Sequence, residues 1–458
     1  MNTPKRDRSS RRRTAVAASL ALAGTLLAVP YIAQAATADE PVTEPVQATP
    51  AELLREQISR AANDLYDTAH KDASTGYSNL VVSTKDSGYT LYWKGEIPAA
   101  VTKLIDAQRT QGLRISIQDA AYTRQELDAK AQVIARPDAT VGGDTITSVG
   151  PSNDGNGLDV TVEPASFVIP GSQQELDALE NDRSALASLT GGIPVNLTKM
   201  AAGTPTIMVP KAPDMTRFQA SGYLPGGAGI GSPNYCTTGF TVVDPLTQVK
   251  YMTTAAHCVN KIGETVKNGN KDKVLGKVID IQEYNDSALI AIDPGVKTSP
   301  TVYSEHGLGI PGGTTRRVAY SSRTFVGELL CADGALLGEQ CGGKVVALGR
   351  QVWDRKNKHY RLLDKVEQVA GRYMAGAGDS GGPVYAGRTG TGNALYAAYP
   401  RGVISMTVDG QSCINPIPGV GKYRPNCSPN IWITNLENSL QLHAQALRLS
   451  SLRVDTFR

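Results

Sequence analysis

The segment Gly378–Pro383 reads Gly-Asp-Ser-Gly-Gly-Pro and contains the residue best suited to nucleophilic chemistry, Ser380. A nucleophilic serine needs an exposed hydroxyl, a nearby base and backbone N–H groups directed at the oxyanion that forms. Glycines on both sides of Ser380 allow the backbone bend that directs such N–H groups inward. The motif alone is a weak signal, because 46 of the 458 residues are glycine and some flank serines by chance.

The candidate base is one of five histidines. His257 follows an apolar run and lies between Ala256 and Cys258, so its neighbours indicate a tightly packed turn that a disulfide can hold. A single histidine is more often structural than catalytic, but the other four are in polar, helical or loop segments without such a setting: His70, His306, His359 and His443. We therefore expect His257 to be the base.

A carboxylate must orient the imidazole and stabilise its cation. Asp286 directly precedes the apolar run Ser287–Ile292, so its side chain is expected at the rim of a barrel. Three rivals are interpreted as turn or solvated residues: Asp272, Asp280 and Asp293.

The order of these residues separates two enzyme classes. The pattern G-x-S-x-G also marks the nucleophile of α/β-hydrolases, in which the acid and the histidine follow the serine. Here His257 and Asp286 precede Ser380, and only His443 lies downstream. The chain also lacks the βαβ alternation that a parallel sheet needs, so the esterase interpretation is excluded.

The amino-terminal 35 residues read as a signal peptide cut after Ala35. A basic stretch is followed by the uncharged run Ala15–Val29 and by Ala33-Gln34-Ala35. A membrane anchor is the alternative, but this run falls short of the roughly 20 residues that a span needs. The formal charge of the whole chain is +3, whereas this leader alone carries +5 and the rest therefore −2. The remainder is nearly neutral, which argues against nucleic-acid binding. We expect a secreted, extracellular protein with no membrane partner.

The rest of the chain falls into two regions of different character. A linker at residues 37–50 leads into a cysteine-free α+β unit that is expected to end near Pro170, followed by a helical stretch at Gln173–Leu189. After Tyr223, glycine and proline are frequent, all six cysteines occur, and short strands indicate an all-β barrel or sandwich. These strands are expected at Gly239–Val243, Tyr251–Ala255, Ser287–Ile292, Lys344–Leu348 and Gly402–Thr407, and a last helix at Ile431–Leu449.

Three motifs in this order resemble the chymotrypsin-like serine protease family: Thr254–Cys258, Asp286–Leu289 and Gly378–Pro383. The long amino-terminal extension resembles the secreted bacterial branch, of the streptogrisin and α-lytic protease type. The resemblance implies two six-stranded antiparallel β-barrels over residues 222–458, with the active site between them. It implies His257 as general base and then acid, Asp286 as its orienting group, Ser380 as nucleophile, and the N–H groups of Gly378 and Ser380 as oxyanion hole.

The resemblance also implies the disulfides Cys236–Cys258 and Cys331–Cys341, which leaves Cys413 to pair with Cys427. Two features depart from the family. No cysteine stands a few residues before Ser380, and Ala332 occupies the place where the bacterial branch usually has an arginine that pairs with the acid before the nucleophile. Asp379 therefore needs another partner, either a new amino terminus or a nearby arginine.

Substrate-binding residues are expected in the stretch Ser405, Met406 and Thr407, which resembles the strand that pairs with the substrate backbone. Thr407 stands where many members have a glycine in the pocket wall, so its side chain should narrow the pocket and favour small or medium apolar residues. No acidic residue occurs near Met374, at the expected pocket base, which argues against a preference for Lys or Arg.

Residues 36–221 resemble, in position and length, the propeptides of the bacterial branch, which assist folding and inhibit the protease until cleaved. A β-barrel with many non-local contacts folds slowly, which gives a folding template a physical rationale. We expect cleavage between Arg217 and Tyr223. The alternative is a permanent binding domain fused to the protease.

The sequence thus predicts a secreted, monomeric serine endopeptidase made as a zymogen, which hydrolyses protein or peptide substrates through an acyl-enzyme and is inhibited by its own propeptide. It predicts no cofactor and no metal, since HExxH and zinc-like cysteine or histidine clusters are missing from the sequence. Two rivals remain: a catalytically silent homologue that binds peptides or surfaces, and a protease that cleaves only itself.

Overall fold

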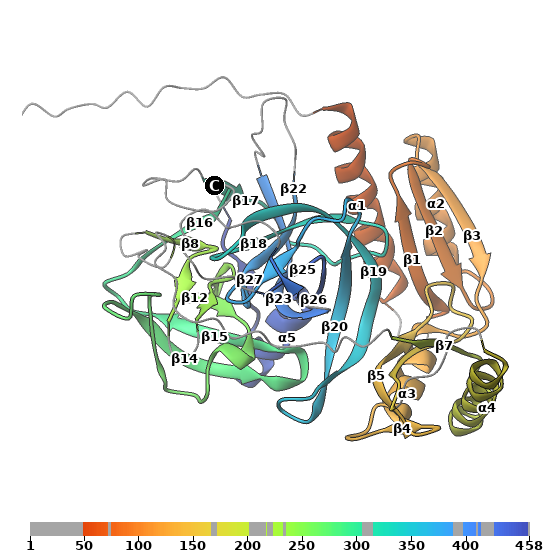
Figure 1. Ribbon diagram of the computed structural model, residues 1–458. Helices are drawn as coiled ribbons and strands as arrows, with labels where there is room; N and C mark the ends of the chain where they lie inside the picture. Colours follow the sequence, from red (N-terminus) through yellow and green to blue (C-terminus); the bar gives the residue numbers. More distant parts are fainter. Residues whose placement is uncertain are drawn as a thin grey trace, which may run out of the picture. The chain divides into compact units, whose positions relative to one another are not determined.

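The computed structural model describes residues 49–71, 75–165, 172–200, 217, 223–231, 235–304, 315–387, 397–408, 411–413 and 426–456. The chain divides into a unit of residues 1–45 and one of residues 46–458, and every described residue is in the second. The predicted signal peptide, Pro170, His306 and all but Arg217 and Tyr223 of the predicted cleavage segment lie outside the described residues. The described part is mostly β, with an α/β region at its amino-terminal end (Figure 1).

The first part of this α/β region is a three-stranded sheet with two helices. Its elements are α1 (Pro50–Ala69), β1 (Tyr77–Ser83), β2 (Gly88–Trp93), α2 (Ala99–Thr110) and β3 (Arg114–Asp119), and the strands pair in the order β1-β2-β3. α1 begins at Thr49, where the Glu52 side chain completes a capping box, and it buries Ile58, Ala62 and Leu65 at helical spacing. These residues pack against the sheet in one hydrophobic cluster.

The second part has its own hydrophobic cluster. Its elements are α3 (Arg124–Ile134), β4 (Thr140–Val141), β5 (Asp144–Pro151), β6 (Leu158–Glu163), α4 (Gln173–Thr190) and β7 (Val195–Lys199). Leu186 of α4 and Leu197 of β7 are buried with Val160 of β6, so these later elements belong to the same core. The sequence analysis instead expected a single unit that ends before α4. It did not predict β5 and β7, which form strands by pairing with β6.

A six-stranded antiparallel sheet positions His257 and Asp286 (green in Figure 1, apart from the blue strand β27). In order across the sheet, its strands are β13 (Thr265–Lys267), β14 (Val274–Gln282), β15 (Ser287–Ile292), β12 (Lys250–Thr254), β11 (Thr241–Val243) and β27 (Arg453–Val454). β15 has the predicted bounds, and β11 and β12 lie within one or two residues of theirs. The last strand of the sheet comes from the end of the chain.

Six further strands pair in a closed cycle, in which each is antiparallel to two of the others (cyan to blue in Figure 1). In order around the cycle they are β18 (Leu329–Gly334), β19 (Gly338–Asp354), β20 (His359–Gln368), β26 (Asn430–Asn435), β23 (Ala397–Val408) and β22 (Pro383–Gly387). Their inward side chains form a core that includes Val345, Val366, Ile404 and Ile433.

Shorter elements complete the described structure. They are the strands β8 (Tyr223–Gly226), β9 (Gly229–Ile230), β10 (Cys236–Thr237), β16 (Lys297–Tyr303), β17 (Thr315–Val318), β21 (Ala375–Gly376), β24 (Gln411–Ser412) and β25 (Asn426–Ser428), and the 3-10 turns η2 (Ala256–Cys258) and η3 (Glu283–Asn285).

The helix expected at Ile431–Leu449 is wrong over its first five residues, which form β26. Ile431 and Ile433 are buried in one cluster and Trp432 in another, which is the alternation of a strand that is covered on both faces. The helix α5 (Leu436–Ala446) begins only after Asn435, whose side chain accepts a hydrogen bond from the Asn438 N–H.

The amino-terminal region joins the cycle of strands through β5. Val149 and Ser148 pair antiparallel with Gln351 and Val352 of β19, which extends the sheet across the two regions. A second contact joins α1 to β23, where buried Arg401 donates to the Ser59 hydroxyl at 2.9 Å and forms an ion pair with Glu328.

Candidate active site

His257 lies in η2, shortly after the end of β12. Ala255 and Ala256 have no exposed surface, so this turn packs closely against the sheet, as small residues allow. Cys258 forms a disulfide with Cys236, which fixes the turn to β10. The His257 side chain is only 3% exposed.

Asp286 follows η3 and directly precedes β15, the strand that pairs with β12. Its φ of 54° places it in the left-handed region, which aspartate tolerates better than most residues. Thr434 of β26 donates to the Asn285 carbonyl at 2.8 Å and so ties this turn to the cycle of strands. Asp286 is fully buried.

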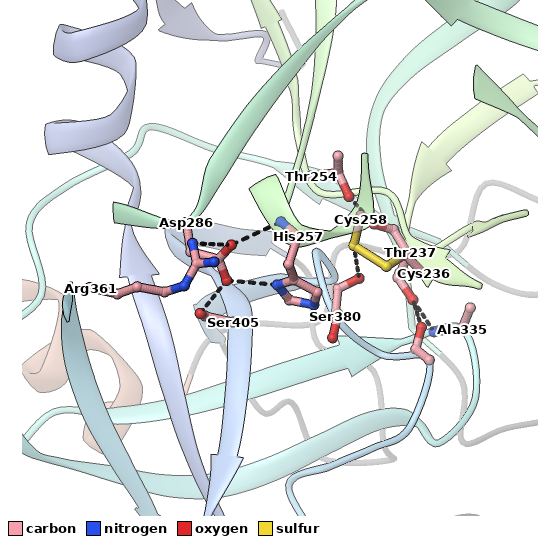
Figure 2. Close-up of a disulfide and its surroundings, with 11 residues drawn as sticks. Cys236, Thr237, Thr254, His257, Cys258, Asp286, Ala335, Arg361, Ser380 and Ser405 are labelled. Atoms are coloured by element: carbon pink, nitrogen blue, oxygen red, sulfur yellow. Dashed lines mark hydrogen bonds and ion pairs between the residues drawn. A yellow bond between two sulfur atoms is a disulfide. The ribbon is translucent and has the colours of Figure 1, made fainter. Parts of the chain in front are cut away.

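The carboxylate of Asp286 accepts four hydrogen bonds, two on each oxygen (Figure 2). Oδ2 accepts from His257 Nδ1 at 2.8 Å and from the Ser405 hydroxyl at 2.5 Å. Oδ1 accepts from the His257 backbone N–H at 3.0 Å and from Arg361 Nη1 at 2.9 Å. The imidazole is therefore held in one orientation, with Nδ1 toward the carboxylate.

Burial alone would raise the pKa of Asp286, but the charge of Arg361 and the contacts with His257 outweigh it. They hold the pKa of this carboxyl well below its usual range. Asp286 is therefore ionised throughout the physiological pH range.

Ser380 lies on the other side of the imidazole from Asp286, next to the second ring nitrogen (Figure 2). Its loop is fixed on both sides: the Ser380 carbonyl accepts from Thr237 N–H at 2.8 Å, and Gly381 N–H donates to Ile404 at 2.7 Å. Gly381 has a φ of +84°, and a Cβ there would lie 2.5 Å from the Thr237 carbonyl oxygen. This position therefore requires glycine.

The N–H groups of Gly378 and Ser380 lie in the same loop. Both residues are buried, and within the described part of the chain no acceptor for either N–H is found. Gly378 has a φ of +113°, the left-handed side that a side chain disfavours.

Asp379 is buried, and its partners differ from those that the sequence analysis considered. Its carboxylate accepts from three backbone N–H groups, those of Gly376, Leu336 and Leu337, at 2.7, 2.7 and 3.2 Å. Burial raises its pKa to about 6. The neighbouring arginine, Arg217, instead pairs with Asp333 at 2.6 Å.

Three disulfides join the pairs that the resemblance implies: Cys236–Cys258, Cys331–Cys341 and Cys413–Cys427. The second links β18 and β19 within the cycle of strands. The third holds β25, in which Cys427 pairs with Gly376 at the start of the loop that contains Ser380. The bridge at Cys427 thus supports this loop from the adjacent strand.

Of the three predicted substrate-binding residues, Ser405 donates its hydroxyl hydrogen bond to Asp286. Met406 is buried in a cluster with Val352 and Trp432, so its side chain serves the core. Thr407 is 5% exposed on the same strand. Binding of a substrate by these residues stays a prediction.

A second Ser–His–Asp set lies beside Asp286. His443 of α5 contacts Asp280 Oδ2 through Nδ1 at 2.6 Å and the Ser287 hydroxyl through Nε2 at 3.0 Å. The sequence analysis interpreted His443 as part of a polar tail and Asp280 as a turn or solvated residue. His443 does lie in a helix, as expected, but it is fully buried, and Asp280 lies in β14 and is only 7% exposed. Since Ser287 is also buried, the set connects α5 to β15, the strand that begins directly after Asp286.

The substitution Asp280→Ala is expected to lower the free energy of unfolding by about 2 kcal/mol at pH 7, because it leaves buried His443 without an acceptor. Burial raises the pKa of Asp280, but hydrogen bonds from His443 and Gln282 lower it below its usual value. Its contribution to stability is thus present above the unfolded pKa and is lost as the pH falls through the folded one. Urea unfolding in the inactive Ser380→Ala background measures it. Exposed Asp272→Ala is the control, and an equal effect of both substitutions contradicts the prediction.

Metal ligation and membrane insertion were also considered. Within the described ranges, two groups of side chains have the spacing of metal ligands, one around His257 and one around Glu339. Each contains two cysteines that are joined in a disulfide, so no thiolate is left to bind an ion. Among the described helices, none combines the length and the apolar character that a membrane span requires.

Two residues of the site were missed from the sequence. Arg361 lies in a strand of ordinary alternation, and its contact with Asp286 depends on the pairing of β20 with β19 and β26. Thr237 stands beside Cys236 and donates to the Gly378 carbonyl at 2.7 Å. Only its position next to a predicted disulfide could have drawn attention to it.

No protein-family model and no curated protein matches this chain. Among solved structures, a protease from Nocardiopsis (20% identity, TM-score 0.36) and a chymotrypsin from Cellulomonas bogoriensis (22% identity, TM-score 0.36) each match 51% of this chain over their whole length. A homologue of α-lytic protease matches the same shares of both chains, with 16% identity and a TM-score of 0.35.

About half of the chain thus has a structural match among bacterial proteases of the chymotrypsin fold, of the streptogrisin and α-lytic type. The match assigns no role to any residue of this chain.

Proposed function

We propose that this protein is a serine endopeptidase made as a precursor. The observation that carries the proposal is the hydrogen-bonded line from Asp286 to His257, with Ser380 at the far side of the imidazole. The N–H groups of Gly378 and Ser380, which have no acceptor in the described structure, support it as the oxyanion hole.

In this mechanism Ser380 Oγ attacks the carbonyl carbon of the peptide bond, and His257 Nε2 takes up its proton. The carbonyl oxygen becomes an oxyanion that accepts hydrogen bonds from the two N–H groups. The C–N bond then breaks as His257 returns the proton to the leaving amine, which leaves an acyl-enzyme. Water attacks the ester by the same route and releases the carboxylic product. Asp286 keeps Nδ1 of His257 protonated and stabilises the imidazolium.

The architecture that we propose is two six-stranded β-barrels. The closed cycle of β18, β19, β20, β26, β23 and β22 is one barrel, and the six-stranded sheet with β11, β12 and β15 is the other. His257 and Asp286 follow or precede strands of the sheet, whereas Ser380 precedes β22 of the cycle. The reacting groups therefore meet where the two barrels adjoin.

The pocket proposed for the substrate side chain lies beside Thr407. A β-branched residue at this position leaves less space than glycine would, so we expect small or medium apolar residues to be accepted. The backbone of Ser405–Thr407 is proposed to pair with the substrate as an added strand, a mode in which main-chain hydrogen bonds supply affinity.

We further propose that residues 1–35 are a removable signal, that residues 36–221 are a propeptide and that 222–458 is a secreted, monomeric protease domain. The pairing of β5 with β19 supports a propeptide that templates and inhibits the protease, because it gives a partner to the part of β19 that extends beyond its pairing with β18. The buried Arg401, which contacts Ser59 of α1, supports the same close association.

Covalent labelling tests the proposed nucleophile. A fluorophosphonate is expected to add once to the processed protein, on Ser380, with loss of fluoride, because only a serine beside a free base and an oxyanion hole reacts rapidly. Peptide mass mapping locates the adduct. Ser287 is the matched comparison, since it also contacts a histidine but is buried in the second set. Labelling on Ser287, or none on Ser380, contradicts the proposal.

A further inference from the structure

Arg361 is a fully buried arginine that contacts the carboxylate of Asp286. Its Nη1 lies 2.9 Å from Oδ1, and neither side chain has exposed surface. The carboxylate already accepts from the His257 N–H, from His257 Nδ1 and from Ser405, so it does not need a charged donor to satisfy its oxygens. A buried charge is costly to maintain, which makes a purely structural explanation insufficient.

Arg361 has a counter-ion on its other side. Its Nε lies 2.8 Å from Asp354 Oδ2, and Asp354 is the last residue of β19. Nη1 also donates to the Glu283 carbonyl at 2.9 Å, and the exposed Glu283 carboxylate lies 3.5 Å away. His359 is a further titratable group here, with its Nε2 4.0 Å from that carboxylate.

The charges therefore alternate along a line from the site into β20 and β19. Asp286 is negative, Arg361 positive and Asp354 negative, and His257 becomes positive when it takes up the proton of the nucleophile. A positive charge within a few ångströms of Asp286 opposes the stabilisation that this carboxylate gives to the imidazolium. Asp354 in turn offsets part of that opposition.

We propose that Arg361 is a positioning residue that orients the Asp286 carboxylate and sets how strongly it stabilises protonated His257, with Asp354 as its counter-ion. This inference rests on the proposed function, because it assigns His257 the role of base. The consequence is that the acid limb of the pH profile of kcat/KM depends on Arg361 in β20 and Asp354 in β19, neither of which takes part in the reaction.

The test is a pair of substitutions with opposite expected signs, made in the full chain and measured on the processed enzyme. Arg361→Met is expected to move the acid limb of kcat/KM to higher pH by about one unit, and Asp354→Asn to lower pH by up to about one unit. Both remove one buried charge, so loss of packing alone does not produce opposite shifts. Shifts of the same sign, or none, overturn the proposal.

Arg316→Met is the matched control. Arg316 is also a buried arginine in an ion pair, with Glu339 at 2.6 Å, but it has no contact with the three reacting groups. The acid limb of this variant is expected to match that of the wild type. A shift as large as that of Arg361→Met means that any lost buried ion pair moves the profile, which overturns the assignment to Arg361.

A second measurement separates this inference from the proposed function. In the Ser380→Ala full chain, the NMR titration midpoint of the His257 imidazole needs no turnover. It is expected to rise with Arg361→Met, fall with Asp354→Asn and return toward its original value with Arg361→Lys. If Arg361→Met does not accumulate, the shift in Asp354→Asn decides alone. Shifts without any hydrolysis by the wild type support the inference while contradicting the protease proposal, and unchanged midpoints overturn the inference.

Discussion

Replacement of Ser380 by alanine is expected to abolish peptide hydrolysis and to leave the secreted chain uncut between Arg217 and Tyr223. Without the hydroxyl no acyl-enzyme forms, and the loss in kcat is expected to approach 10⁶-fold, on the order of what removal of a nucleophile costs in such sites. Intact-mass spectrometry of the wild type and of Ser380→Ala, expressed side by side, measures the cut. A fluorogenic peptide measures hydrolysis.

The outcomes of this comparison are distinct. If the wild type is cut and the variant is not, the protein processes itself. If both are cut, another protease makes the cut, and hydrolysis of added peptides decides the role of Ser380. If neither is cut, residues 36–221 are a permanent domain and the precursor proposal is wrong. A variant that retains most of the hydrolysis contradicts the site itself.

The cut also reports on the pocket. The residue before the cut is expected to be small or of medium size and apolar, since Thr407 narrows the space beside it. Ala220 fits this expectation. A cut directly after Arg217 contradicts it, and is also disfavoured by the buried ion pair between Arg217 and Asp333.

Replacement of Asp286 by asparagine is expected to lower kcat by about 10⁴-fold at neutral pH. The carboxylate accepts four hydrogen bonds, and an amide has one oxygen and two N–H donors in their place. Either the imidazole takes the wrong tautomer or the amide N–H groups face Arg361 and Ser405. Steady-state kinetics on the processed enzyme measure the loss.

Asp293→Asn is the control for this substitution. Asp293 was one of the rival candidates, but it is exposed, and its carboxylate accepts a hydrogen bond from the Gly295 N–H. Its kcat is expected to equal that of the wild type. A loss of less than tenfold in Asp286→Asn contradicts the proposed role of the carboxylate.

The core of the site was predictable from sequence because its chemistry is local. A glycine-flanked serine, a histidine beside a cysteine and an aspartate before an apolar strand are each short patterns, and their order excluded the α/β-hydrolase alternative. The structure brings His257 and Asp286 into contact and places Ser380 at the imidazole. β15 also lies at its predicted bounds, since the apolar run that defines it is contained within a few residues.

The rest depended on contacts between distant segments. Arg361 reaches Asp286 across 75 positions of sequence, and His443 reaches Ser287 across 156. β26 was mistaken for the start of a helix because its apolar residues fit either period, and only its pairing with β20 and β23 decides. The partners of Asp379 are backbone N–H groups, which no side-chain pattern reveals.

The sheet that carries His257 and Asp286 is completed by β27, whose Val454 pairs with Val242. During synthesis, this edge therefore has no partner until β27 has left the ribosome, long after β11. The two amino-terminal clusters draw almost all of their side chains from residues made much earlier. Because early segments can fold while later ones are still being made, the order of synthesis presents β5 as a formed strand before β19 exists to pair with it.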